Sequence, residues 1–300
     1  MTPRISIPDD IDGYLASSES QFDDIVDGAE KTVIWRDPLT RTRTPLALIY
    51  LHGFTASRQE IAPVPERVAE ALGANLFYTR LAGHGRSGDA LGSATLADWL
   101  CDCAEALEIG RRIGDRIVIM GTSTGGTLAI RLAVKGQTEL ADALVLISPN
   151  FGPLERGAET LTWPGARWWA PLIEGEYRCA KPHNELHRKY TIPRYHTRAL
   201  IPMMELVKTT RAAPVQRISI PTLVVYSRND TIVDPAQTEA FFRRLGSPNK
   251  QLIEFHGADD PQQHVLGGDI VSPSGTQPLA DVIVGFIRED VTPAEAQLRN

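Results

Sequence analysis

One serine in this sequence has the surroundings of a catalytic nucleophile. Ser123 lies in the segment GTSTG (121–125), which fits the pattern G-x-S-x-G and follows the apolar run RIVIM. The pattern describes a sharp turn from a strand into a helix, in which the strained serine needs glycine neighbours. The turn exposes the hydroxyl at a helix start, where backbone N–H groups stabilise negative charge. Ser123 is therefore a candidate nucleophile, although a glycine-rich turn that binds phosphate has similar features.

A serine hydroxyl needs a base, and the base needs an acid that orients it. In folds with this serine motif the acid comes later in the chain, at the carboxyl end of a strand. Asp230 and Asp234 both follow the strand-like run TLVVYS. Asp234 precedes Pro235 and a helical pattern, so a role as helix N-cap explains it. We expect Asp230 to be the acid, with Asp234 as the alternative.

The base is expected last in the chain, after the final strand-like run QLIEF. His256 and His264 both stand there. His256 directly ends the run and can simply pack against the strand. His264 lies in a polar loop that can reach back over the edge of the sheet. We expect His264 to be the base, and His256 is the alternative.

A fourth part of such a site stabilises the oxyanion that forms during acyl transfer. His52, Gly53 and Phe54 directly follow the strand-like run LALIYL, and one N–H of the oxyanion hole is expected after an early strand. Gly53 lets the backbone approach the substrate. We expect the N–H groups of Phe54 and Thr124 to be the two donors.

The elements that must hold these residues are short strands that alternate with longer helices. Several of the strands are apolar throughout, as buried parallel strands are. The alternation predicts an α/β fold with a doubly wound, mostly parallel sheet and helices on both faces. The expected strands are 32–35, 46–53, 75–80, 116–121, 143–148, 222–227 and 251–255, and the expected helices are 58–73, 95–114, 124–136 and 234–246.

Residues 151–215 break this alternation. They contain several prolines and no clear strand, and they are too many for a plain loop in a compact domain. We expect them to form a mainly helical cap, inserted after the sixth strand and lying over the sheet. Residues 1–150 and 216–300 would then form the core domain.

Composition and charge exclude several other classes of protein. A formal net charge of −6 argues against a nucleic-acid partner, which needs a basic surface. No apolar run is long enough to cross a membrane, and the polar N-terminus does not resemble a signal peptide. Cys101, Cys103 and Cys179 are an odd number of cysteines in a chain too large to need disulfides. We therefore expect reduced thiols and a cytoplasmic enzyme.

Two further motifs have other interpretations. Residues 83–88 fit G-x-G-x-x-G after a strand, but the following helix is expected to start well beyond the third glycine, so NAD binding is not favoured. His183 and His187 in HNELH have the spacing of a zinc helix, but Asn184 stands where the metalloprotease motif needs glutamate. We interpret HNELH as the polar face of a cap helix.

The motifs together resemble those of the α/β-hydrolases, in the branch of lidded esterases, monoacylglycerol lipases and serine aminopeptidases. The resemblance implies Ser123 as nucleophile, Asp230 as acid, His264 as base, and the N–H groups of Phe54 and Thr124 as oxyanion hole. Residues 1–45 and the insertion match no motif of the family. The matching segments are LHGF (51–54), RLAGHGRS (80–87), GTSTGG (121–126), RNDTIVD (228–234) and His264.

These features predict a serine hydrolase that cleaves a small-molecule carboxylic ester, as a carboxylesterase or lipase does, without a metal or organic cofactor. Trp163, Trp168 and Trp169 in the insertion are candidate substrate-binding residues and suggest an apolar acyl group. Two alternatives stay open. A thioesterase or peptidase would use the same three residues, and a binding or receptor protein could keep the fold without turnover.

Overall fold

The structure is a computed structural model and describes residues 5–134, 141–155 and 157–291. Its centre is a seven-stranded sheet with the order β1-β3-β2-β4-β5-β8-β9. β1 runs antiparallel to β3, and the other neighbouring strands pair in parallel. The expected mostly parallel sheet is confirmed. Its strands are β1 (Thr32–Ile34), β2 (Thr44–Leu51), β3 (Asn75–Tyr78), β4 (Gly114–Thr122), β5 (Ala143–Ile147), β8 (Thr222–Tyr226) and β9 (Lys250–Glu254).

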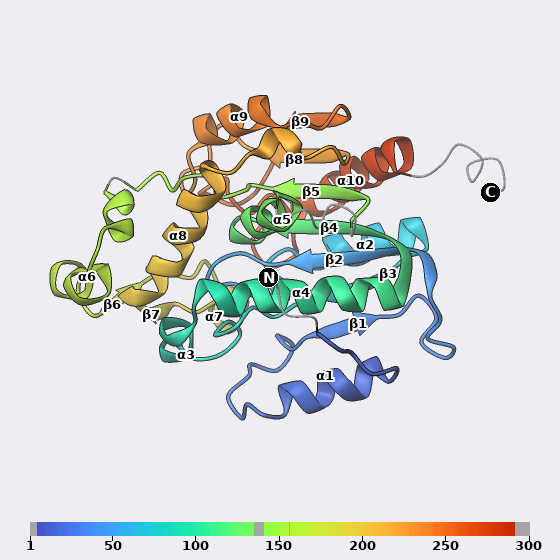
Figure 1. Ribbon diagram of the computed structural model, residues 1–300, viewed down its shortest axis with the longest axis horizontal. Coiled ribbons are helices and arrows are strands. Elements are labelled where there is room, and N and C mark those ends of the chain that lie inside the picture. The colour runs from blue at the N-terminus through green and yellow to red at the C-terminus, as the bar shows by residue number, and fades with distance from the viewer. Residues whose placement is uncertain (1–4, 135–140, 156, 292–300) are drawn as a thin grey trace.

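Helices cover both faces of the sheet (Figure 1). α2 and α10 pack together on one face through residues such as Val68 and Ile283, and α4, α5 and α9 bury Trp99, Leu128 and Phe241 on the other. β3, β5 and β8 are therefore buried along their whole length. The helices are α2 (Val64–Leu72), α4 (Leu96–Ile113), α5 (Thr124–Val134), α9 (Pro235–Arg244) and α10 (Thr276–Asp290), and the expected end of helix 124–136 lies outside the described residues.

The first of these helices begins later than the sequence pattern predicts. The expected helix 58–73 is divided into a short 3-10 helix, η1 (Arg58–Glu60), and α2. Pro63 and Pro65 explain the division. A proline disfavours helical conformation in the residue before it and lacks an N–H, so it suits only the first turn of a helix.

The insertion lies beyond the carboxyl ends of the parallel strands, at the left of Figure 1. The prediction that it follows the sixth strand is wrong, because it leaves the sheet after β5, the fifth strand, and returns at β8. It also contains an antiparallel pair, β6 and β7, that was not expected, since three-residue strands are too short to show alternation. α8 closes the insertion and packs against α5. The elements are η3 (Ala158–Thr162), α6 (Ala166–Glu174), β6 (Tyr177–Cys179), α7 (Glu185–Tyr190), β7 (Arg194–His196), η4 (Thr197–Ala199), α8 (Leu200–Arg211) and η5 (Val215–Arg217).

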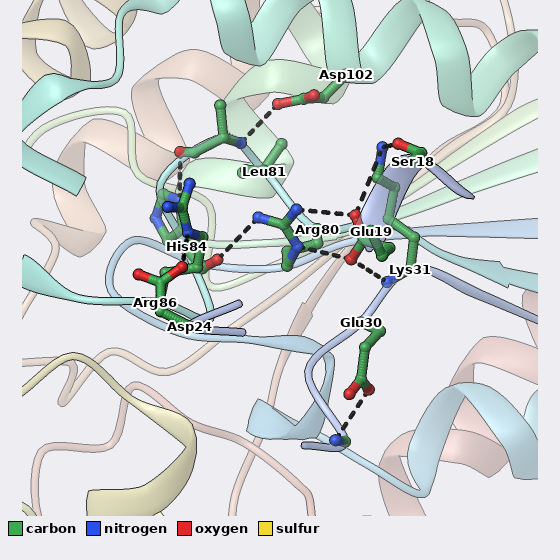
Figure 2. A network of polar contacts seen from close by, with 12 residues as sticks. Ser18, Glu19, Asp24, Glu30, Lys31, Arg80, Leu81, His84, Arg86 and Asp102 are labelled. Atoms are coloured by element: carbon green, nitrogen blue, oxygen red, sulfur yellow. Dashed lines mark hydrogen bonds and ion pairs between the residues drawn. The ribbon is translucent and has the colours of Figure 1, made fainter. Parts of the chain in front are cut away.

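The N-terminal segment, which matches no family motif, braces the loop that follows β3. Arg80 in this loop donates from Nε and Nη2 to the two carboxylate oxygens of Glu19 at the end of α1 (Ile11–Glu19), at 2.8 Å each (Figure 2). Both side chains are buried. Arg80 also donates to the carbonyl of His84 at 3.2 Å, and Lys31 lies 2.8 Å from Glu105 of α4. Buried ion pairs therefore connect the N-terminal segment with the loop and with α4.

The glycine-rich loop 83–88 leads directly into a helix. α3 (Gly88–Ser93) begins at the third glycine, so the expectation of a much later helix start is wrong. The reason is a cap, because the Ser87 hydroxyl accepts the N–H of Ala90 at 3.2 Å. A side chain on Gly88 would collide with the backbone of Arg194 in β7. The glycine therefore serves the contact between α3 and the insertion.

The three cysteines are free thiols in different surroundings. Cys103 is buried in α4, Cys101 is partly buried, and Cys179 in β6 is exposed. Among the described residues, no helix is both long enough and apolar enough to cross a membrane.

Candidate active site

Ser123 occupies the sharp turn that the sequence predicts. β4 ends at Thr122 and α5 begins at Thr124, so Ser123 alone connects them. Its φ of +52° lies in the left-handed region, which residues other than glycine rarely adopt. Its N–H donates to the Ile147 carbonyl of β5 at 2.9 Å, and its carbonyl accepts the N–H of Asn150 at 3.1 Å. These bonds hold the strained backbone in place.

The two flanking glycines leave the space that the turn needs. A Cβ atom on Gly121 would lie 2.5 Å from the backbone of Gly125, and a Cβ atom on Gly125 would collide with the carbonyl of Leu51 in β2. Either side chain would push α5 away from the strands. Close packing against β2 therefore requires glycine here as much as the turn does.

Asp230 and His264 are in direct contact. Nδ1 of His264 lies 2.7 Å from Oδ2 of Asp230, and both side chains are buried. The other carboxylate oxygen, Oδ1, accepts the N–H groups of Ile232 at 2.8 Å and Val233 at 3.0 Å, which fixes the orientation of the carboxylate. When Nδ1 donates to Asp230, the free lone pair of the ring is on Nε2, as a general base requires.

The charges around His264 favour its protonated form. Burial alone would lower the pKa of His264, because it disfavours the charged ring. The hydrogen bond and charge of Asp230, with the charges of Glu60 and Asp260, outweigh burial and raise this pKa above its ordinary value. The ring is therefore a stronger base than a free histidine.

Two side chains that the sequence analysis missed hold the backbone at His264. Asp260 accepts the N–H groups of His264 at 3.0 Å and Val265 at 2.8 Å. Ser148, directly after β5, donates its hydroxyl to the His264 carbonyl at 2.7 Å. Asp260 stands directly before Pro261, and an Asp-Pro pair favours a turn. This turn signal in the sequence could have indicated Asp260. Ser148 carries no comparable signal.

The loop after β2 is held by His52. Nε2 of His52 accepts the N–H of Leu81 at 3.1 Å, so Nδ1 carries the proton and donates to the Gly53 carbonyl at 2.9 Å. Burial lowers the pKa of His52 to about 4, so the ring stays neutral. Phe54 follows in the wall of the cavity described below. Thr124 is the first residue of α5, and the first N–H groups of a helix have no acceptor within it.

The alternative acid and base lie outside this arrangement. Asp234 is the N-cap of α9, as the sequence pattern indicates, and its Oδ1 accepts the N–H of Ala236 at 2.9 Å. The His256 side chain is 77% exposed and lies 4.0 Å from Glu254. Neither Asp234 nor His256 lines the cavity that contains Ser123.

A cavity of about 970 Å³, here called the main cavity, lies between Ser123 and the insertion. Ser123 and His264 both line it, together with two residues that the sequence analysis missed, Glu60 and Asn150. Asn150 is buried, and among the described residues its Oδ1 has no hydrogen-bond partner. The insertion contributes further lining residues, among them Leu154, Lys181, Tyr190, Tyr195 and Met203.

A family model described as serine aminopeptidase, S33, matches residues 43–259 of the chain. The chain belongs to this family. The matched segment contains Ser123 and Asp230 and ends before His264.

Relatives of this S33-family protein include a thermostable monoacylglycerol lipase of Bacillus sp. (strain H-257). The two are 23% identical over 222 residues, which cover 74% of this chain and 85% of the lipase. A solved structure from work on LipS and LipT, two metagenome-derived lipolytic enzymes, superposes with a TM-score of 0.73 at 20% identity, over 88% of this chain and 99% of that one. Est1E from Butyrivibrio proteoclasticus, with ferulic acid bound, gives a TM-score of 0.63 at 19% identity, over 89% of this chain and 97% of that one. The fold is that of the α/β-hydrolases.

In this S33-family protein the three candidate substrate-binding tryptophans of the insertion do not line the main cavity. Trp163 and Trp169 line a second cavity of about 450 Å³, here called the side cavity, whose walls share Pro153, Glu155 and Met203 with the main cavity. Trp168 is 75% exposed and borders a shallow outer pocket together with Trp163. Their role in substrate binding stays a prediction, and it requires a substrate that reaches beyond the main cavity.

The histidines of HNELH line the main cavity as a stacked pair. The ring centroids of His183 and His187 are 5.0 Å apart, with 6° between the planes, and Nε2 of His183 lies 3.6 Å from Asp260. His187 accepts the N–H of His183 through Nδ1 at 3.1 Å, and burial lowers its pKa. In the part of the chain that the structure describes, no cluster of three or more His, Cys, Asp or Glu side chains could hold a metal.

Proposed function

We propose that this S33-family hydrolase cleaves a carboxylic ester through an acyl-enzyme formed on Ser123. One observation carries the proposal, the 2.7 Å contact between His264 and Asp230 at a cavity that Ser123 also lines. The strained backbone of Ser123, at φ +52°, adds support, because strain of this kind is concentrated at functional sites.

The proposed reaction begins when Ser123 Oγ attacks the ester carbonyl and Nε2 of His264 takes its proton. Asp230 keeps the ring in the required tautomer and stabilises the imidazolium that forms. The N–H groups of Phe54 and Thr124 stabilise the oxyanion. His264 then gives the proton to the leaving alcohol. Water, activated by the same histidine, releases the acid from Ser123.

We further propose an apolar acyl group as the part of the substrate that reaches the side cavity. Leu161, Trp163 and Trp169 present apolar surface there, and Met203 borders both cavities. Apolar walls of this kind bind alkyl chains by removing their surface from water. The relatives named a monoacylglycerol lipase and lipolytic enzymes are consistent with such a substrate. Residues 151–215 would then act as a lid that completes the pocket.

The test combines a covalent probe with a panel of substrates. A fluorophosphonate probe should label the wild type on Ser123, and Ser123→Ala should abolish both labelling and turnover while the fold is retained. Nitrophenyl esters from acetate to palmitate, run beside thioester and amide analogues, then identify the reaction. Faster turnover of the thioester or amide would assign a thioesterase or peptidase. Labelling without turnover of any compound would favour a binding protein, and labelling of another serine would exclude Ser123 as nucleophile.

A further inference from the structure

Thr122, directly before Ser123, takes part in a buried hydrogen-bonded chain that the mechanism above does not use. Its hydroxyl oxygen lies 3.0 Å from the hydroxyl of Tyr50 in β2, and Thr122 and Tyr50 are fully buried. The Tyr50 hydroxyl lies 3.1 Å from Oε2 of Glu60. The same Oε2 accepts the N–H of Gly53 at 2.9 Å. The chain therefore runs from the serine turn to the loop after β2.

The direction of the hydrogen bonds follows from the chemistry of the groups. An ionised carboxylate can only accept, so Gly53 N–H and the Tyr50 hydroxyl both donate to Glu60. Tyr50 has a single proton, and Thr122 must therefore donate to Tyr50. In this arrangement the polar hydrogens of Thr122, Tyr50 and Gly53 all have an acceptor. Hydrogen bonds are stronger in such buried, low-dielectric surroundings.

The two ends of this hydrogen-bonded chain, Gly53 and Thr122, lie next to the residues of the two proposed oxyanion donors. Gly53 is bonded to Phe54, and Thr122 is two residues before Thr124. Gly53 also packs tightly on the carboxylate, because a Cβ atom at this position would lie 2.6 Å from Oε1 of Glu60. The loop after β2 is thus held against Glu60 by a hydrogen bond and by close contact.

We propose that Glu60 is a positioning residue, which fixes the loop of Phe54 relative to the turn of Ser123 through Gly53 on one side and Tyr50 and Thr122 on the other. The inference rests on the proposed function, since it assigns Phe54 and Thr124 as oxyanion donors. It also accounts for threonine at position 122, whose hydroxyl G-x-S-x-G does not require.

Glu60 has a second effect, through its charge. The charged groups that act on His264 are Asp230, Glu60 and Asp260, and the negative charge of Glu60 helps to raise the pKa of the ring. Burial raises the pKa of Glu60 itself above its ordinary value, and the opposing effects of the Gly53 N–H, the charge of His264 and the Tyr50 hydroxyl offset this only in part. Removing this charge should lower the pKa of His264 and extend activity to more acidic pH.

Two substitutions of Glu60 separate position from charge. Gly53 and Tyr50 share one oxygen of Glu60, so the amide oxygen of Glu60→Gln can accept from both while the charge is lost. Glu60→Ala removes the acceptor as well. Thr122→Val keeps the shape of the side chain but removes the hydroxyl that bonds to Tyr50. Glu70→Gln, at an exposed position in α2, is the matched control.

The experiment measures the rate of fluorophosphonate labelling from about pH 5 to about pH 9, beside thermal unfolding. We expect Glu60→Gln to label at nearly the wild-type rate at the alkaline plateau, with its acidic limb moved to lower pH. Glu60→Ala also loses the charge, so its acidic limb should move in the same direction, but at the alkaline plateau it should label about 10² more slowly, because a displaced donor group weakens transition-state stabilisation. Thr122→Val should label several-fold more slowly, and Glu70→Gln should match the wild type.

Specific results would overturn the inference. A wild-type labelling rate in both Glu60→Ala and Thr122→Val would overturn it. An acidic limb of the pH profile that stays at the wild-type position in Glu60→Gln would also overturn it. If Glu60→Ala does not fold, a wild-type rate for Thr122→Val is sufficient. Ser123→Ala keeps the two proposals apart. Labelling that persists in Ser123→Ala rejects the proposed function, whereas labelling that is lost there but unchanged in the Glu60 and Thr122 variants rejects the role of Glu60 alone.

Discussion

Asp230 binds His264 through Oδ2 and its own loop through Oδ1. The first bond is 2.7 Å long and joins residues 34 positions apart, and the second oxygen is committed to the N–H groups of Ile232 and Val233. The carboxylate therefore cannot rotate without losing bonds to its own loop. An asparagine at this position would keep Oδ1 on the loop and turn its NH₂ group toward His264.

Asp230→Asn should therefore inactivate the protein without unfolding it. The amide NH₂ facing Nδ1 favours the tautomer with the proton on Nε2, where the lone pair for Ser123 is needed. We expect a loss of about 10⁴ in kcat, by analogy with the serine-protease triad, and little change in Tm. Steady-state kinetics and thermal unfolding of the same preparation measure both. A kcat of Asp230→Asn near the wild-type value would show that Asp230 is not the acid that orients His264.

Substitutions of Asp234 should show the opposite behaviour. As the N-cap of α9 it accepts the N–H of Ala236, so Asp234→Ala should cost about 1 kcal/mol in the free energy of unfolding and little activity. Asp234→Asn should be nearly silent, because asparagine caps a helix almost as well. Urea unfolding and kcat, measured on both variants, check this. An inactive Asp234→Asn beside an active Asp230→Asn would exchange the two assignments.

The pH dependence of kcat/KM should reflect the raised pKa of His264. The ring must be neutral to act as a base, so activity is lost as pH falls through its pKa. Asp230, Glu60 and Asp260 together overcome the effect of burial and raise this pKa, so the midpoint of the acidic limb should lie above about 6.5, the ordinary histidine value. A rate profile on a nitrophenyl ester measures it. A profile that stays flat from about pH 5 to about pH 9 would argue against a histidine base.

Glu19→Ala should strongly destabilise the fold. It leaves the Arg80 guanidinium buried without its counter-charge, which costs about 3–5 kcal/mol when one partner of a buried pair is removed. Burial alone would raise the pKa of Glu19, but the hydrogen bond and charge of Arg80, with Lys31, lower it. The pair therefore stabilises fully above the ordinary glutamate pKa, and this stabilisation is lost as pH falls through the lowered value. Urea unfolding at neutral and acidic pH should show a difference between wild type and variant that shrinks in acid.

Asp24→Ala is the matched control for Glu19→Ala. Asp24 pairs with Arg86 in the same network (Figure 2), but both side chains are more exposed, at 37% and 22%. A pair of this kind contributes at most about 1 kcal/mol. Equal destabilisation by the two variants would show that burial of the Arg80–Glu19 pair has no special weight.

Trp169→Ala should change the preference for acyl chain length more than it changes stability. The indole lines the side cavity, and its removal changes the surface that a long chain would contact. We expect a shift of about tenfold in the kcat/KM ratio of long to short nitrophenyl esters. Trp168→Ala, at a side chain that is 75% exposed, should shift this ratio much less. An unchanged ratio of long to short esters in Trp169→Ala would show that the side cavity does not bind the acyl chain.

Much of the site could be predicted because its local rules are strong. The turn at Ser123 needs a strand, two glycines and a helix, and all of these are contiguous in the sequence. The choice of Asp230 over Asp234 depended on Pro235, a local helix-start signal that assigns Asp234 another role. The strands of the sheet are visible for a similar reason, since burial on both faces leaves uninterrupted apolar runs.

The remaining parts depend on contacts that no local pattern encodes. Ser148 and His264 are 116 positions apart, and only the sheet brings the end of β5 beneath the loop. In the sequence, Glu60 is one more polar residue of the expected helix 58–73, and its bonds to Gly53 and Tyr50 form only when η1 folds against β2. β6 and β7 are strands because they pair with each other, since three residues carry too little pattern to predict a strand.

The distribution of thiols makes the insertion accessible to selective chemistry. Cys179 is exposed in β6, whereas Cys103 is fully buried in α4 and Cys101 is partly covered. A maleimide dye or a nitroxide should therefore attach first at Cys179, without any engineered cysteine. The label would sit on the part of the chain that covers Ser123, and its fluorescence or mobility would report how that cover responds when an inhibitor binds.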